Sequence, residues 1–206
     1  MPQGMGNGLP PETRLPSHTF KVLFHMLLQK HPFLVFLIGA RASGKSTLGR
    51  LLAEKLQLAF ADTDQHIRAA SGLEVDEIVA RNGWPAFRVQ ESAVLRECAL
   101  PYTVVATGGG MVLDPDNRAF MRATGTVFFL DAPARLLSSR LAKSLQATWR
   151  PSLTGLPPAE EIALVLAERE PIYRTTAHHI INAVRPLPKL VRELANLISP
   201  SGSIPS

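Results

Sequence analysis

A glycine-rich stretch with one lysine and several hydroxyl side chains has the clearest chemical pattern in the sequence. It matches G-x-x-x-x-G-K-[ST] and reads Gly39-Ala40-Arg41-Ala42-Ser43-Gly44-Lys45-Ser46-Thr47. The glycines let backbone N–H groups turn inward toward a polyphosphate, and a helix that begins near Lys45 adds its positive N-terminal end. Lys45 can contact the β- and γ-phosphates, and the Ser46 hydroxyl can bind Mg²⁺. Because an apolar run over residues 33–38 supplies a preceding strand, we predict a nucleoside triphosphate site rather than a simple glycine turn.

Two carboxylates follow the next short apolar run, residues 58–61. Ligands bind beyond the carboxyl ends of strands in open α/β sheets, which is where Asp62 and Asp64 would lie. Side chains alternate along an extended chain, so one carboxylate can face a metal ion while the other faces an acceptor. Asp62 is therefore the candidate to hold Mg²⁺, directly or through water, and Asp64 is the candidate acceptor of a proton or a hydrogen bond from an attacking hydroxyl. Alternatively, either acid only caps a helix expected over residues 65–70.

Two further segments have residues suited to binding an anionic acceptor. Arg88 and Glu91 are three residues apart in a helical segment, so Glu91 could hold the guanidinium for a substrate carboxylate. An exposed ion pair is the alternative. The strand expected over residues 103–106 leads into Gly108, Gly109 and Gly110, whose backbone permits close approach of a ligand. A binding loop is favoured there over a flexible turn.

The second half of the sequence contains an irregular segment between two helical patterns. Residues 143–158 include Arg150 and show little periodicity, which predicts a mobile lid over phosphates, with a solvated connector as the alternative. The helical pattern over residues 159–176 carries Arg169, and Pro171 is expected to kink that helix. His178 and His179 are adjacent in the last expected strand and face opposite ways, so a structural role is favoured over a metal pair.

The whole pattern predicts one α/β domain with a parallel sheet flanked by helices, over residues 33–198. Residues 1–32 read as a disordered leader and residues 199–206 as a flexible tail, from their Gly, Pro and Ser content. The chain has 206 residues with 22 Lys and Arg against 17 Asp and Glu, but the basic residues are scattered, which argues against nucleic acid as a partner. The apolar run 20–28 is too short to span a membrane. The single cysteine, Cys98, excludes an internal disulfide and fits a packed thiol in a cytoplasmic protein.

Taken in their order along the sequence, these motifs resemble those of the shikimate kinase family, within the nucleoside monophosphate kinase-like branch of P-loop folds. The resemblance runs from about residue 33 to residue 198 and rests on a set of short patterns. They are the phosphate loop, Asp62-Thr63-Asp64, Phe87-Arg88 followed by Glu91, Gly108-Gly109-Gly110, Arg150-Pro151, and Arg169 followed by Pro171 and Tyr173. Trp84 stands where many members carry an acidic residue, so the wall beside the substrate is expected to differ.

The resemblance implies a five-stranded P-loop NTPase-type sheet and ATP-dependent phosphorylation of the 3-hydroxyl of shikimate, in the pathway to chorismate and aromatic amino acids. It implies that the phosphate loop binds ATP, that Ser46 and Asp62 serve Mg²⁺, and that Asp64 is the base. Arg88 and Arg169 would bind the shikimate carboxylate, beside Gly108, Gly109 and Gly110. Arg150 would meet the transferring phosphate, while Arg140 and Arg185 would contact the adenine. We expect a monomer.

Two other functions remain open on the sequence alone. One is a related P-loop kinase for another polyol acid, of the gluconate type, against which Arg88, Arg169 and the three glycines argue. The other is a non-catalytic ATP-binding or regulatory module. The presence of all four residues argues against that module, because a chain without activity is expected to have replaced at least one of them. The four are Lys45, Asp62, Asp64 and Arg150.

Overall fold

The structure is a computed structural model that describes residues 33–143 and 155–198. The chain divides into two units, residues 1–32 and residues 33–206, and the fold below is that of the second unit. The expected leader, Arg150 with most of the expected lid, and the expected tail lie outside the described residues.

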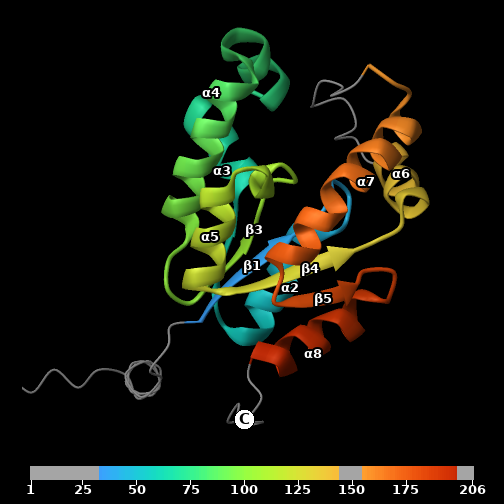
Figure 1. Cartoon of the computed structure of the whole chain (residues 1–206). Helices are drawn as coiled ribbons and strands as arrows, with labels where there is room; N and C mark the ends of the chain where they lie inside the picture. Colours follow the sequence, from blue (N-terminus) through green and yellow to red (C-terminus); the bar gives the residue numbers. More distant parts are fainter. Residues whose placement is uncertain (1–32, 144–154, 199–206) are drawn as a thin grey trace, which may run out of the picture. The chain divides into compact units, whose positions relative to one another are not determined.

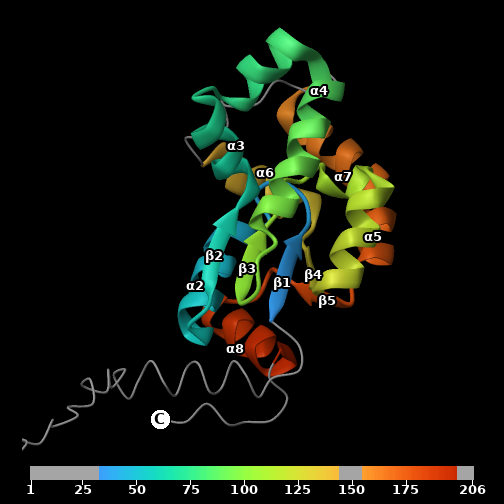
Figure 2. The ribbon, with the colours of Figure 1, turned by 90° about the vertical axis from the view of Figure 1, so that its left-hand side faces the viewer.

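A five-stranded parallel sheet forms the centre of the domain (Figure 1). Its strands are β1 (Leu34–Ile38), β2 (Ala59–Asp62), β3 (Thr103–Ala106), β4 (Thr126–Asp131) and β5 (His179–Asn182). Their order is β2-β3-β1-β4-β5, so β1 lies in the middle and pairs with β3 and β4. Figure 2 shows β2, β3 and β1 running in the same direction. Because all strands are parallel, the loops after β1, β2 and β3 open at one edge of the sheet, and the predicted fold class is confirmed.

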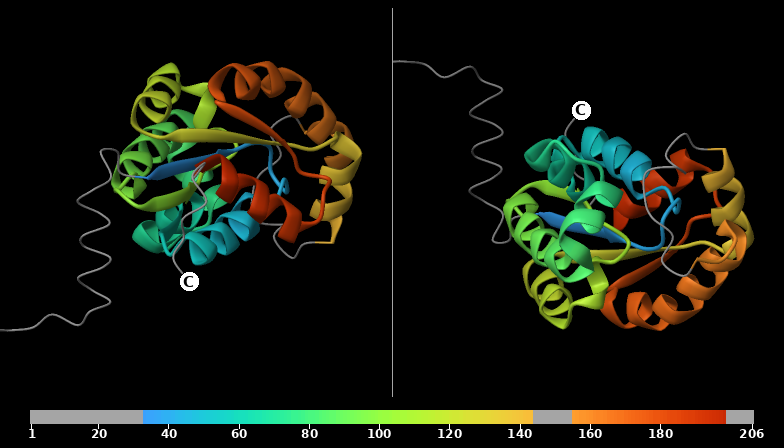
Figure 3. Two further views of the ribbon diagram at one scale, coloured as in Figure 1. Left: turned by 90° about the horizontal axis from the view of Figure 1, so that it is seen from below. Right: turned by 90° about the horizontal axis from the view of Figure 1, so that it is seen from above.

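Helices cover both faces of the sheet. They are α2 (Lys45–Leu56), α3 (Thr63–Ser71), α4 (Val75–Cys98), α5 (Pro115–Thr124), α6 (Ala134–Ala142), α7 (Pro158–Thr176) and α8 (Leu187–Ile198), with a short 3-10 helix η1 (Met111–Leu113). Figure 3 shows α2 and α8 on one side of the sheet and α5 and α7 on the other. Val35 and Leu37 of β1 pack in the core cluster beside α2 and α8, whereas Phe36 and Ile38 pack in the opposite cluster. The alternation of side chains along a buried strand thus builds two cores.

Local sequence signals explain several element boundaries. Gly83 has φ 76° and ψ 167° inside α4, so α4 consists of two helical segments joined across a kink at Gly83. Asp114 caps α5 by accepting a hydrogen bond from the Asp116 N–H, and Pro115 occupies the first turn. The α7 helix runs through Pro171 to Thr176 without a break. Within residues 33–143 and 155–198, no helix is both long and apolar enough to cross a membrane.

The two adjacent histidines have structural contacts, as expected. His178 Nδ1 accepts a hydrogen bond of 3.0 Å from the Val127 N–H, and the His179 ring stacks on Phe128 with centroids 5.1 Å apart. Burial is the main cause that lowers the pKa of His178, with the charge of Arg122 acting in the same direction. The two rings therefore support the sheet edge at β4 and β5.

Candidate active site

The phosphate loop joins β1 to α2 in a tight backbone turn. Gly39 has φ 142° and Gly44 has φ 98°, a region that favours glycine, and a Cβ at Gly39 would lie 2.9 Å from the carbonyl oxygen of Leu130. Ala42 also has a positive φ, 63°, which the sequence pattern did not indicate. The α2 helix begins at Lys45, as predicted. The N-terminal end of α2 therefore points at the space enclosed by the loop.

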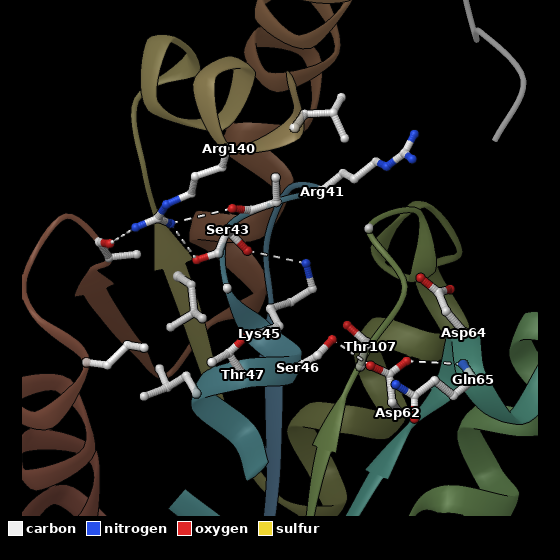
Figure 4. A pocket seen from close by; sticks show the side chains of 18 of the residues that line it. Arg41, Ser43, Lys45, Ser46, Thr47, Asp62, Asp64, Gln65, Thr107 and Arg140 are labelled. Carbon is white, nitrogen blue, oxygen red and sulfur yellow. Dashed lines mark hydrogen bonds between the residues drawn. The ribbon is translucent and has the colours of Figure 1, made fainter. Parts of the chain in front are cut away.

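Lys45 lies within this loop and is 9% exposed. Its Nζ donates hydrogen bonds to the carbonyl oxygens of Gly39 (2.9 Å) and Ala40 (2.8 Å), and to Ser43 Oγ (3.3 Å). These contacts hold a compact positive charge next to the helix N-terminus (Figure 4). Such a concentration of N–H donors and one ammonium group suits a polyphosphate.

Ser46 and Asp62 form the oxygen-rich side of the site. Ser46 Oγ donates a hydrogen bond of 2.6 Å to Asp62 Oδ2, and Asp62 Oδ1 accepts one of 3.2 Å from the Gln65 N–H. Asp62 is thus also the N-cap of α3, so the capping alternative is realised alongside the contact with Ser46. A hydroxyl and a carboxylate side by side are the oxygen ligands that Mg²⁺ prefers.

Asp64 faces the glycine loop, for a different reason from the one expected. We expected Asp62 and Asp64 to diverge by alternation along a strand, but β2 ends at Asp62 and Asp64 is already in the first turn of α3. Helix geometry, not strand alternation, therefore turns Asp64 away from Asp62. A Cβ added at Gly108 would lie 2.8 Å from Asp64 Oδ1, so only glycine admits this carboxylate so close to the loop.

Thr63, between the two aspartates, anchors the glycine loop. Its Oγ1 accepts a hydrogen bond of 2.9 Å from the Gly108 N–H, and its side chain is buried. On the other side of the loop, Thr107 Oγ1 donates to the carbonyl oxygen of Leu37 at 3.1 Å. The start of the glycine loop is therefore fixed to both β1 and α3.

Arg88 and Glu91 form an ion pair on α4, beside the same loop. The Glu91 side chain is only 1% exposed, so the alternative of an ordinary exposed ion pair is wrong. The Arg88 guanidinium lies over the Trp84 ring, with Cζ 5.1 Å from the ring centroid. A Cβ added at Gly110 would be 2.6 Å from Arg88 Cζ, which places the guanidinium directly against the loop. Trp84 and Glu91 thus hold Arg88 in one place.

Arg169 approaches the glycine loop from α7. Its Nη1 donates to the carbonyl oxygen of Gly109 at 3.5 Å, and the Tyr173 hydroxyl donates to the same oxygen at 2.6 Å. The structure therefore brings Asp64, Arg88 and Arg169 together around the three glycines, although they come from three different helices. Two guanidinium groups near the Asp64 carboxylate suit the binding of an acceptor that has both an anionic group and a hydroxyl.

One cavity of about 470 Å³ joins the phosphate loop to Asp64 and Gly109. Figure 4 shows Lys45, Ser46 and Asp62 in its middle, with Arg140 on one side and Asp64 on the other.

Arg140 donates to the carbonyl oxygens of Ser43 and Ala183, both at 3.2 Å, and so connects the phosphate loop to the segment after β5. Thr47 and Arg185 also line the cavity. Arg88 and Arg169 lie against the glycine loop, and Gly109 of that loop lines the cavity.

Comparison with known proteins places the chain. A family model described as Shikimate kinase matches residues 41–199. The chain belongs to the shikimate kinase family. A shikimate kinase of Oleidesulfovibrio alaskensis is 52% identical over 82% of this chain and 98% of its own length, and shikimate kinase 2 of Dickeya chrysanthemi is 51% identical over 78% and 92%.

Solved structures agree with this placement. A shikimate kinase from Acinetobacter baumannii in complex with shikimate has a TM-score of 0.76 and 31% identity, covering 86% of this chain and 99% of that one. The shikimate kinase from Bacteroides thetaiotaomicron has a TM-score of 0.73 and 32% identity, covering 81% and 98%. The family resemblance stated from the motifs is therefore confirmed.

Three residues of this shikimate kinase family member lie at the site, although the sequence analysis assigned them no role. Arg41 lines the cavity and extends from the phosphate loop toward the side on which Asp64 lies (Figure 4). Its charge at a variable position of the loop pattern was the available signal. Thr63 and Tyr173 stood inside recognised motifs, but their contacts with the glycine loop depend on how α3 and α7 pack.

Proposed function

We infer that this chain transfers the γ-phosphoryl group of ATP to the 3-hydroxyl of shikimate, giving shikimate 3-phosphate for chorismate and aromatic amino acid synthesis. Family membership supports the reaction, because the relatives at 52% and 51% identity are shikimate kinases. One structural observation carries the substrate assignment. Asp64, Arg88 and Arg169 converge on the glycine loop at the same sheet edge as the phosphate loop.

We propose that the phosphate loop binds the ATP phosphates through its backbone N–H groups and through Lys45. The residues in this role are Gly39, Ala42, Ser43, Gly44, Lys45, Ser46 and Thr47. Arg140 and Arg185 are proposed to contact the adenine end, since both line the cavity. Arg140 lies on the side of the phosphate loop away from Asp64 (Figure 4). Arg150 lies outside the described residues and remains proposed as the cation that meets the transferring phosphate.

Ser46 and Asp62 fit Mg²⁺ and are proposed to hold it. Mg²⁺ usually takes one or two protein oxygens and completes its octahedron with water and phosphate oxygens. When bound, the ion would neutralise charge on the phosphates.

On the acceptor side, Arg88 and Arg169 are proposed to bind the shikimate carboxylate through their planar guanidinium groups. The loop formed by Gly108, Gly109 and Gly110 would lie beside the sugar-like ring. Asp64 would orient the 3-hydroxyl and accept its proton as the oxygen bonds to the γ-phosphorus and ADP leaves. Phosphoryl transfer depends mainly on such positioning and on positive charge near the phosphate oxygens, which Lys45 supplies.

A coupled ADP-release assay tests this assignment with Mg-ATP and either shikimate or gluconate. The proposal predicts rapid turnover with shikimate and little with gluconate, and Asp64→Asn should reduce turnover while ATP binding persists. Preference for gluconate would favour the other kinase, and ATP binding without turnover of either acid would favour a regulatory module. The proposed monomer is tested separately by light scattering during gel filtration.

A further inference from the structure

Tyr173 is a buried residue of α7 with no role in the reaction described so far. Its side chain is 1% exposed, and its ring stacks on Phe129 of β4 with centroids 5.1 Å apart and planes 20° apart. Packing alone would be satisfied by phenylalanine. The hydroxyl, however, donates a hydrogen bond of 2.6 Å to the carbonyl oxygen of Gly109. Its one polar group therefore contacts the loop that faces the acceptor.

The carbonyl oxygen of Gly109 is a shared contact between α7 and the glycine loop. Arg169 Nη1 approaches the same oxygen at 3.5 Å, so it is the weaker of the two donors by distance. Arg169 and Tyr173 are four residues apart and lie on one face of α7, one turn from each other. The short bond from Tyr173 therefore fixes the helix turn that also carries Arg169.

The same bond sets the direction of one peptide group in the loop. A trans peptide is planar, with its C=O and N–H on opposite sides, and the described residues contain no cis peptide. Because the Gly109 carbonyl points at Tyr173, the Gly110 N–H points away from α7. Glycine has few conformational restraints of its own, so a loop of three glycines needs an external contact to hold this orientation.

We propose that Tyr173 is a positioning residue for the acceptor. Its hydroxyl holds the Gly109–Gly110 peptide and Arg169 in fixed positions relative to each other. This inference rests on the proposed binding of shikimate against the glycine loop. Tyr173 does not touch the reacting atoms; it acts through Gly109 and Arg169.

The protonation state of Tyr173 supports its role as a donor. Burial raises the pKa of Tyr173 to about 12, while the nearby charge of Arg169 acts in the opposite direction. The hydroxyl therefore keeps its proton, and with it the hydrogen bond to Gly109, across the pH range in which the enzyme would be assayed.

Steady-state kinetics of Tyr173→Phe test the proposal. This substitution keeps the buried ring and removes the donor, so the KM for shikimate should rise about tenfold, or ~1.4 kcal/mol, with the KM for ATP and kcat within about twofold of wild type. Tyr102→Phe is the matched control, because Tyr102 is the other of the two tyrosines in the chain and does not line the cavity.

A second control separates positioning from general support of α7. Arg122 on α5 donates to the carbonyl oxygens of Thr175, Thr176 and Ala177, at the end of the same helix. Arg122→Gln should lower Tm without changing the ratio of the two KM values. If Tyr173→Phe behaves like Arg122→Gln, or raises both KM values equally, Tyr173 only supports the fold.

A spectroscopic measurement covers the case in which Tyr173→Phe does not fold. In the protein labelled with 3-fluorotyrosine, the ¹⁹F signal of Tyr173 should shift when shikimate is added, and the signal of Tyr102 should not. An unmoved Tyr173 signal at saturating shikimate would overturn the proposal. Wild-type protein that fails to phosphorylate shikimate would instead reject the proposed function, so the two failures are distinguishable.

Discussion

Gly110→Ala should damage shikimate binding by moving one arginine. A Cβ at this position would lie 2.6 Å from Arg88 Cζ and 2.7 Å from Nη2, and it would clash with Nη1, so the guanidinium must leave its place. The Gly110 backbone, at φ −93° and ψ −5°, accepts alanine without strain. The obstacle is the end of a flexible side chain, so the protein should still fold.

The expected magnitude follows from the contact that is lost. A charge-assisted hydrogen bond contributes ~1.5–3 kcal/mol, so the KM for shikimate should rise by about 10- to 150-fold while the KM for ATP stays near wild type. Moving the Arg88 guanidinium away from the buried Glu91 should cost ~1–3 kcal/mol of folding free energy. This cost is offset by ~0.4–1 kcal/mol, because alanine restricts the unfolded chain more than glycine does. Tm should therefore fall by less than about 10 °C.

A double-mutant cycle shows whether the effect passes through Arg88. Arg88→Ala should itself raise the KM for shikimate more than the KM for ATP. If displacement of the guanidinium is the cause, adding Gly110→Ala to Arg88→Ala should change the KM for shikimate little further. Fully additive effects would refute the reasoning, because they would mean that the new methyl group obstructs the acceptor directly. An unchanged KM in Gly110→Ala alone would refute it as well.

Four other predictions concern Lys45, Asp62, Cys98 and the first 31 residues. Lys45→Ala should reduce kcat by several orders of magnitude, and near-normal turnover would remove Lys45 from the mechanism. Asp62→Asn should raise the Mg²⁺ concentration needed for half-maximal rate, an effect absent if Asp62 only caps α3. Burial raises the pKa of Cys98 to about 11, so at pH 8 the native thiol should react with a disulfide reagent far more slowly than the unfolded thiol, and equal rates would contradict its burial. Deleting residues 1–31 should leave folding and turnover largely intact, and an insoluble product would contradict the predicted disorder of the leader.

Local patterns predicted most of the fold. The strand at residues 103–106 has the predicted bounds, because a short apolar run is visible in sequence. The start of α2 at Lys45 was likewise predicted from the position of the phosphate-loop motif. These features depend on neighbouring residues only.

Features that depend on packing between distant elements were not predictable in the same way. The burial of Glu91 requires α4 to press against the glycine loop, and an i, i+3 spacing alone does not distinguish it from an exposed pair. The positive φ of Ala42 reflects closure of the phosphate loop, which an alanine does not signal. Thr63 and Tyr173 bind loop backbone 45 and 64 residues away in sequence.

Turnover of shikimate compared with its methyl ester tests the central claim most directly, because the ester keeps the ring hydroxyls and removes the anionic charge. If Arg88 and Arg169 bind the carboxylate, kcat/KM for the ester should be at least about 100-fold lower in wild type. This difference should shrink when either arginine is replaced by alanine. Equal kcat/KM for the acid and the ester in wild type would contradict the account.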